Sequence, residues 1–307
     1  MRIAYQGEPG AFSEAAARQV GPSAEMMPSK AFEDVFAAVD RGDADYGVLP
    51  IENSIGGSIH RNFDLLLEHT LPIVGEVEQP VVHHLLALPG VTMDSIRRVY
   101  SHPQALAQCD RFLRTLSGVE IIATYDTAGS AKMIADEKMH DAAAIASARA
   151  GEVFALATVK ASIQDYEHNV TRFLVIGKQP LTQAGAASQP APSTSQPAEP
   201  AADNARDAFK TTIVFTLPNE PGGLFKALSV FALRGINLTK LESRPVPSRK
   251  WEYLFYADLA AAREEPACAN ALANLAEFAP MLRVLGSYAS TKPQAARGAA
   301  ASVEIPA

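Results

Sequence analysis

Hydrophobic and polar positions follow two different periods along the first 181 residues. Short apolar runs, typical of buried strands, are "RIAYQG" (2–7), "YGVLPIE" (46–52), "PVVHHLLAL" (80–88), "RRVYS" (97–101), "VEIIATY" (119–125) and "AAAIAS" (142–147). Between them the apolar residues recur at helical spacing, which predicts helices over 12–20, 32–39, 57–68, 103–116 and 126–137. Ser29 is expected to cap the second of these helices. Strands that alternate with helices predict an α/β domain with largely parallel sheets.

The pattern changes after an Ala/Pro/Ser-rich segment over 182–208, which holds no large apolar residue. Such a segment cannot bury enough surface to offset its ordering entropy, so we expect a disordered linker. Beyond it, strands are predicted over 210–217, 236–246, 250–260 and 281–287, with helices over 223–234 and 266–278. This order, βαββαβ, predicts a ferredoxin-like α+β domain. The expected domains are therefore 1–181 and 209–288, followed by a loose tail over 289–307.

Composition narrows the class of protein. The chain has 307 residues and a formal net charge of −7, which disfavours nucleic acid as a partner because phosphate binding needs a basic face. No apolar run approaches the length of a membrane span and no signal peptide is evident, so we expect no membrane partner and a cytoplasmic location. The two cysteines lie far apart, and His83 and His84 would point to opposite faces of a strand. We therefore expect chemistry without a metal.

Polar residues gather where predicted strands end and helices begin. Such stretches are "GEPGAFSE" (7–14), "LPIENSIGGSI" (49–59), "YSHPQALAQC" (100–109) and "YDTAGSAKMI" (125–134). Helix N-termini favour anions, and ligands of open α/β sheets bind beyond the carboxyl ends of the strands. Each stretch alone is typical of an ordinary helix start, with Ser101 in the cap position of one. Four such starts that face one crevice would form a cleft that binds an anion through neutral donors.

The stretch "HNVTRF" (168–173) precedes another strand-like run. On an extended segment Thr171 and Phe173 share one face, whereas Arg172 points to the other. Spacing alone leaves two interpretations open. The stretch is a turn followed by core packing, or it carries a proton donor, a carboxylate anchor and a hydrophobic wall.

Taken in order, these segments resemble prephenate dehydratases. The resemblance rests on "GEPGAFS", "PIENSIGG", "SHPQAL", "TAGSA", "AAIAS" and "NVTRF". The second domain resembles the ACT regulatory domain of the same enzymes through "EPGGLFKAL" and "LTKLESRP". The resemblance implies two α/β lobes around a cleft, similar to type II periplasmic binding proteins. It implies decarboxylating dehydration of prephenate to phenylpyruvate in L-phenylalanine biosynthesis, without a cofactor. It further implies inhibition by L-phenylalanine and a homodimer or homotetramer formed through ACT domains.

The resemblance also assigns residues. Thr171 would be the catalytic residue that donates to the departing hydroxyl, Arg172 an anchor for a substrate carboxylate, and Phe173 a wall for the ring. The other substrate-binding residues would be Ser13, Asn53, Ser54, Ser101, Gln104 and Thr127. The effector-binding residues would be Gly222, Gly223, Leu224, Phe225, Asn237, Leu238, Glu242, Ser243 and Arg244. Glu52 is interpreted as structural, because a carboxylate repels a dianionic substrate.

Three alternatives stay open. An arogenate dehydratase performs the same chemistry on the amino-bearing analogue of prephenate. A non-catalytic amino-acid sensor would keep both kinds of domain, and a solute-binding transport protein would share the lobes. The intact "TRF" triplet and the lack of an export signal favour the dehydratase, which we expect to be monofunctional. The long linker leaves open how strongly effector binding is coupled to catalysis.

Overall fold

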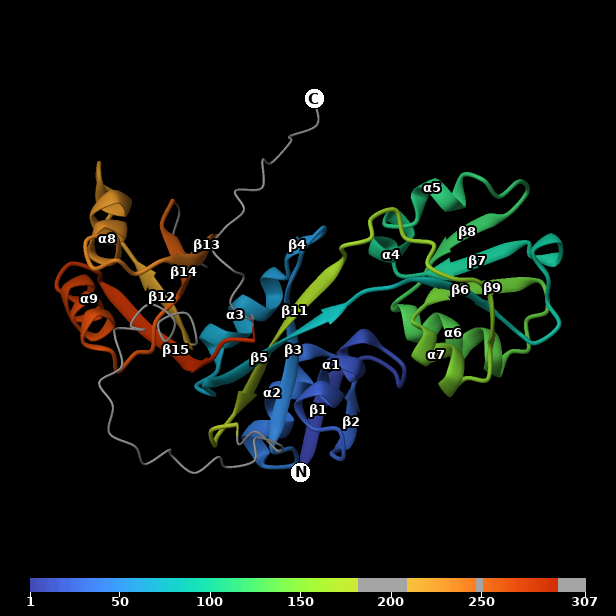
Figure 1. The fold of residues 1–307 in the computed structure, drawn as a ribbon, viewed down its shortest axis with the longest axis horizontal. Helices are drawn as coiled ribbons and strands as arrows, with labels where there is room; N and C mark the ends of the chain where they lie inside the picture. Colours follow the sequence, from blue (N-terminus) through green and yellow to red (C-terminus); the bar gives the residue numbers. More distant parts are fainter. Residues whose placement is uncertain (182–208, 247–250, 292–307) are drawn as a thin grey trace, which may run out of the picture. The chain divides into compact units, whose positions relative to one another are not determined.

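The structure, a computed structural model, describes residues 1–181, 209–246 and 251–291 (Figure 1). The chain divides into two compact units between Ala187 and Ser188. The expected linker over 182–208 and nearly all of the expected tail lie outside the described residues. Within the described ranges, no helix is long and apolar enough to cross a membrane.

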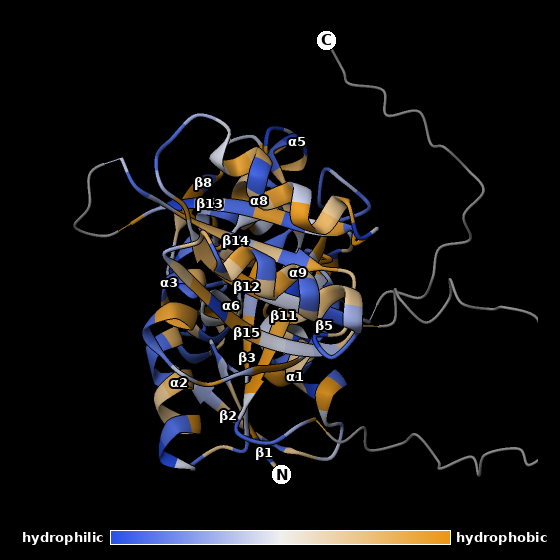
Figure 2. Cartoon of the chain, turned by 90° about the vertical axis from the view of Figure 1, so that its left-hand side faces the viewer, coloured by the Kyte–Doolittle hydropathy of each residue, from blue (hydrophilic) through white to orange (hydrophobic). Residues whose placement is uncertain are grey.

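The first unit consists of two α/β lobes, as predicted. The first lobe is built on a sheet with the strand order β5-β11-β3-β1-β2. Its strands are β1 (Arg2–Gln6), β2 (Glu25–Ser29), β3 (Tyr46–Asn53), β5 (Ile73–Pro80) and β11 (Val170–Gly177), and the short β4 (Gly57–Ser58) pairs with β3. Its helices are α1 (Phe12–Val20), α2 (Phe32–Arg41) and α3 (His60–Glu68). β3 and β11 are hydrophobic along most of their length (Figure 2), as expected for strands buried on both faces.

The second lobe carries a sheet with the order β10-β6-β9-β7-β8. Its strands are β6 (His84–Ala87), β7 (Arg98–Ser101), β8 (Glu120–Ala123), β9 (Ala142–Ala146) and β10 (Ala157–Lys160). Its helices are α4 (Pro103–Ala107), α5 (Asp110–Leu113), α6 (Thr127–Asp136) and α7 (Ala148–Val153), and a 3₁₀ turn η1 spans Met93–Ser95. The chain enters this lobe after β5 and returns through β11 (Figure 1).

The prediction of largely parallel sheets was wrong. β1 pairs in parallel with β2 and β3, but β11 runs antiparallel to both β3 and β5. In the second lobe β7 is parallel to β8 and β9, whereas β6 is antiparallel to β9 and β10. In the first lobe the antiparallel pairing follows from the topology. The strand β11, which returns from the second lobe, inserts between β3 and β5, and both of these run in the opposite direction.

Several local predictions also need correction. Ser29 does not cap α2, because it ends β2; Ala31 is the N-cap, and its amide donates to Asp34. The helix expected over 57–68 begins only at His60, because residues 57–58 pair with β3. The helix expected over 103–116 is interrupted between α4 and α5, where the side chain of Gln108 is buried. The strands β2, β5 and β10 and helix α7 were not predicted.

One packing arrangement places the site. Helix α1 covers the sheet face that carries Tyr5, Val48 and Phe173. Side chains alternate along a strand, so Thr171 lies on this same face of β11. The beginning of α1 and the beginning of β11 therefore meet at one edge of the first lobe, where the second lobe joins it.

The second unit has the predicted βαββαβ order. Its elements are β12 (Phe209–Thr216), α8 (Gly223–Ala232), β13 (Leu238–Pro245), β14 (Tyr253–Leu259), α9 (Pro266–Ala276) and β15 (Met281–Ala289). β13 pairs with β14, β14 with β12, and β12 with β15, each time antiparallel. Residues of α8 and α9, such as Phe231 and Leu275, pack against Phe215 and Leu259 of the sheet.

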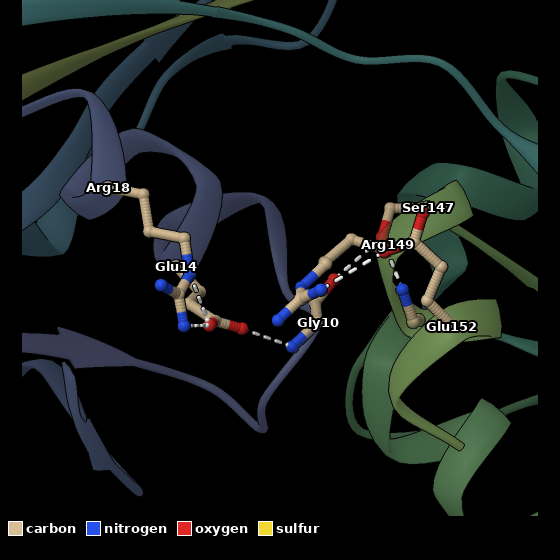
Figure 3. Close-up of polar contacts among 7 residues, drawn as sticks. Gly10, Glu14, Arg18, Ser147, Arg149 and Glu152 are labelled. Carbon is tan, nitrogen blue, oxygen red and sulfur yellow. Dashed lines mark hydrogen bonds and ion pairs between the residues drawn. The ribbon is translucent and has the colours of Figure 1, made fainter. Parts of the chain in front are cut away.

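A backbone contact joins the two lobes at Gly10, on the loop before α1 (Figure 3). Ser147, the N-cap of α7, donates to the carbonyl oxygen of Gly10 over 2.6 Å. The Gly10 amide donates to buried Glu14, which also pairs with Arg18. Gly10 has φ +91°, and a Cβ there would lie 2.6 Å from the Cα of Ala150. Only glycine allows the lobes to approach this closely.

Gly10→Ala is therefore expected to lower the free energy of unfolding by about 2–4 kcal/mol, the sum of a positive-φ penalty and backbone overlap. Gly42→Ala is the matched control, because Gly42 has φ +80° but no atom near the added Cβ. It should lose only about 1 kcal/mol. Urea unfolding followed by far-UV circular dichroism measures both, and equal losses would contradict a structural role for the lobe contact.

Candidate active site

A cavity of about 180 Å³ lies between the two lobes of the first unit. The four predicted helix-start segments all contribute to its wall, through Gly7 to Ser13, Asn53 to Ile59, His102 to Gln108, and Asp126 to Thr127. Of the residues predicted to bind substrate, the cavity is lined by Ser13, Asn53, Gln104, Thr127, Thr171 and Phe173. The expected meeting of these segments is confirmed.

Thr171 and Asn53 face each other across the β11–β3 pair. The Asn53 side-chain oxygen accepts hydrogen bonds from the backbone amides of Ile55 (3.1 Å) and Gly56 (2.7 Å). Backbone amides only donate, so the orientation of the Asn53 carboxamide is fixed. Its Nδ2 donates to Thr171 Oγ1 over 2.9 Å. The Thr171 oxygen is thus an acceptor in this pair, and its own hydrogen is left to donate elsewhere.

Three further polar residues, which the sequence analysis did not assign to the site, extend this network. Asn53 Nδ2 also donates to Asn169 Oδ1 (2.7 Å), and Asn169 Nδ2 donates to Gln108 Oε1 (2.9 Å). Gln108 Nε2 reaches Asn53 Oδ1 (3.3 Å), and His83 Nε2 lies 3.0 Å from Gln108 Oε1. All of these side chains are buried. Asn169 and Gln108 lay inside the quoted stretches, but nothing local distinguishes them from surface amides.

The structure places Arg172 outside this cavity. As the alternation predicted, it points away from Thr171, and its Nε donates to Glu76 on β5 over 2.7 Å. The two side chains are only 12% and 1% exposed. The guanidinium is therefore held in a buried ion pair rather than at the cleft.

Two predicted serines also have other partners. Ser101 is buried and donates to the carbonyl oxygen of Ile145 over 2.7 Å. Its prediction as a helix cap was wrong, because His102 caps α4 by accepting from the Gln104 amide. Exposed Ser54 donates to the carbonyl oxygen of His168 and accepts from the amide that begins β11. These two serines bond to the backbone of segments next to the cleft and do not line the cavity.

The cavity wall contains no lysine or arginine among the described residues. Its ionisable side chains are Asp126, His83 and His102. Burial lowers the pKa of each histidine and raises the pKa of Asp126, which caps α6 by accepting from Gly129. An anion in this cleft would be held by neutral donors and by the start of α1, which has no side-chain cap.

In the second unit the predicted effector residues fall on two elements. Gly222 precedes α8 with φ +80°, and Leu224 and Phe225 follow it with 37% and 79% of their surface exposed. Asn237 precedes β13, and Ser243 is exposed on this strand. Leu238, Glu242 and Arg244 are half-buried on β13, and Gly223 is buried at the first position of α8.

Comparison with known families gives two matches. The model of the family described as prephenate dehydratase matches residues 3–181, and that of the ACT domain matches residues 211–277. The arogenate dehydratase/prephenate dehydratase 2 of Arabidopsis thaliana is 50% identical, over 94% of this chain and 72% of its own length. Arogenate dehydratase 2 of Petunia hybrida is 46% identical over the same shares.

Solved structures agree with these matches. The prephenate dehydratase of Arthrobacter aurescens, in complex with L-Phe, has a TM-score of 0.79 and 30% identity, over 94% of this chain and 90% of that one. GqqA, described as a novel type of quorum-quenching acylase, has a TM-score of 0.79 and 35% identity, over 95% and 98% of the chains. The chain therefore belongs to the prephenate dehydratase family and carries a C-terminal ACT domain.

Proposed function

We propose that this chain is a prephenate dehydratase, which converts prephenate to phenylpyruvate, carbon dioxide and water in L-phenylalanine biosynthesis. The observation that carries the proposal is the orientation of Thr171. Its oxygen accepts a hydrogen bond from Asn53, and its hydrogen is left to donate into the cavity between the lobes. This is the arrangement that a departing hydroxyl group requires.

The reaction breaks two bonds of the substrate. The electron pair of the bond to the ring carboxylate enters the ring as carbon dioxide leaves, and the bond to the ring hydroxyl breaks as the ring becomes aromatic. The departing oxygen takes up a proton from solvent and leaves as water. A threonine hydroxyl is a weak acid, so we assign Thr171 a strong hydrogen bond to this oxygen as negative charge develops on it. One such donor is typically worth about 10²–10³ in kcat.

The remaining lining residues suit the substrate. Ser13, Gln104 and Thr127 offer neutral donors for carboxylates, and Phe12 and Phe173 offer apolar surface for the ring. Arg172, held by Glu76, supports the strand that presents Thr171 and does not contact substrate in this arrangement.

The same geometry favours dehydration over the acylase activity that GqqA is named for. A nucleophilic hydroxyl needs an adjacent base to take its proton. Thr171 Oγ1 instead meets the NH₂ group of Asn53, which can only donate. Thr171 is therefore a donor and not an activated nucleophile.

Replacing Thr171 by valine tests this function, because valine keeps the shape and removes the hydroxyl. We expect kcat for phenylpyruvate formation from prephenate to fall by about 10²–10³, with a smaller change in KM. Thr171→Ser is the control, because it retains the hydroxyl and should retain most activity. If the Thr171→Val enzyme kept the wild-type kcat, residues 168–173 would be interpreted as a turn followed by core packing.

A second candidate substrate is arogenate, which several relatives are named for. The observation that favours it is Asp126, the carboxylate among the described lining residues of the cavity. It would accept a hydrogen bond from the ammonium group of arogenate, whereas it repels the keto acid.

Asp126→Asn should therefore lower kcat/KM for arogenate by about tenfold or more, the effect of losing a charge-assisted hydrogen bond, and leave kcat/KM for prephenate unchanged or higher. Asparagine is an equally good helix cap, so α6 should remain intact. Parallel assays with both substrates decide the preference. Equal losses for the two would mean that Asp126 serves only as a cap.

We further propose that L-phenylalanine binds the ACT domain and inhibits the enzyme. The start of α8 after Gly222 would hold the carboxylate, and the exposed Leu224 and Phe225 would surround the ring. The edge strand β13 of a second copy would complete the site through its "ESRP" run, in a homodimer or homotetramer. The bound L-Phe of the Arthrobacter aurescens structure supports this effector.

Ser243→Ala should raise the phenylalanine concentration for half-inhibition about five- to tenfold, as expected for one lost hydrogen bond, and leave uninhibited turnover in place. Thr239→Ala is the matched control, because Thr239 is also exposed on β13. Inhibition curves for both variants give the answer, and an unchanged curve for the Ser243 variant would contradict the assigned effector site.

We place this activity in the cytoplasm or in an equivalent plastid compartment. Both cysteines are buried and free, in keeping with a reducing environment. Some relatives are named as chloroplastic enzymes.

A further inference from the structure

His83 ends the buried network that begins at Thr171, and the mechanism above gives it no task. Its side chain is 2% exposed and lies at the wall of the cavity. The ring packs edge-on against Phe12, with centroids 5.6 Å apart and planes at 86°. Its Nε2 lies 3.0 Å from Gln108 Oε1.

The proton on His83 can be placed by following the network from the backbone. The amides of Ile55 and Gly56 fix Asn53 Oδ1, so Asn53 Nδ2 must face Asn169 Oδ1. Asn169 Nδ2 then donates to Gln108 Oε1, while Gln108 Nε2 faces Asn53 Oδ1.

The Gln108 orientation is thus set from two sides, and its Oε1 can only accept. His83 Nε2 must therefore carry the hydrogen, which leaves Nδ1 as a bare acceptor. Burial lowers the pKa of His83, in keeping with a neutral ring.

His83 Nδ1 is buried and has no hydrogen-bond partner among the described residues. An unsatisfied buried acceptor costs folding free energy, and such groups are rare enough to need a reason. A phenylalanine would pack against Phe12 at this position without that cost. The Nε2–H group, which meets Gln108 Oε1, is what the histidine supplies here and a phenylalanine would not.

The network also crosses the cleft. Asn53 and Thr171 belong to the first lobe, whereas His83 and Gln108 belong to the second. The network around the catalytic hydroxyl thus includes a side chain delivered by the opposite lobe.

We propose that His83 is a positioning residue for the dehydration step, an inference that rests on the proposed function. Its Nε2–H holds Gln108, which contacts Asn53 and Asn169. The backbone amides set which way the Asn53 carboxamide faces, and Gln108 and Asn169 keep its Nδ2 in place for the bond to Thr171. His83 acts through these side chains and does not touch the substrate.

Two substitutions separate this role from packing. His83→Phe keeps a buried ring and removes the N–H, so kcat should fall about five- to twenty-fold while KM stays within about twofold. Its thermal stability should stay equal or rise, because the unsatisfied acceptor is gone. His83→Gln offers an N–H near the Nε2 position and should recover most of kcat.

A double-mutant cycle tests the path. Gln108→Met should lower kcat by about as much as His83→Phe does. The double variant should have a kcat no lower than the single variants, because both substitutions break the same series of hydrogen bonds. Wild-type kcat in His83→Phe, or losses that multiply in the double variant, would overturn the proposal. So would a loss confined to KM.

A readout independent of turnover completes the test. Nitrogen-15 NMR of labelled histidine should show His83 protonated at Nε2 and bare at Nδ1. Protonation at Nδ1 instead would show that His83 does not donate to Gln108, and it would overturn the proposal even if the enzyme is active. A wild type that turns over neither prephenate nor arogenate would overturn the proposed function itself, and with it the positioning role, whatever the tautomer.

Discussion

The Asn53 carboxamide, held by two backbone amides, sets the direction of the hydrogen bonds that run from Thr171 to His83. An aspartate could accept from the same amides, but it could not donate to Thr171. The loop that supplies the amides passes close to the second lobe. A Cβ on Gly56 would lie 1.8 Å from Gln104 Nε2, so the glycine leaves room for a lining side chain. The run "ENSIGG" thus orients the Asn53 NH₂ group toward Thr171 and leaves room for the Gln104 side chain beside it.

A cleft whose described wall holds no lysine or arginine suits this reaction for a physical reason. One carboxylate of prephenate is lost as neutral carbon dioxide, so its charge is present in the ground state and disappears. A fixed cation beside it would stabilise the substrate more than the transition state and slow the step. Neutral donors and a helix start hold the anion with less of this bias. Arg172 lies near the cleft, but its ion pair with buried Glu76 balances the charge of its guanidinium. It therefore does not act as a fixed cation beside the substrate.

The parts of this site that sequence could predict are the local ones. Apolar runs and turn residues predict most strands and helix starts, and strand alternation predicts that Thr171 and Phe173 share a face. The partner of Arg172 could not be predicted, because Glu76 lies 96 residues away on a strand whose pattern was not recognised. Gln108 and His83 become part of the site only when the lobes meet. A polar side chain in a sequence does not say whether folding will bury it.

The two lobes are joined by contacts of unequal strength. The Gly10 contact involves backbone atoms and a buried serine, so it cannot be broken without loss of packing. The Lys132–Glu8 pair across the cleft is more than a third exposed on both sides and contributes little. Between these extremes lies the Gln108–Asn53 bond, buried but long at 3.3 Å. A lobe movement that broke this bond would remove the support that Gln108 gives to Asn53, whereas the bond from Asn53 to Thr171 lies within the first lobe.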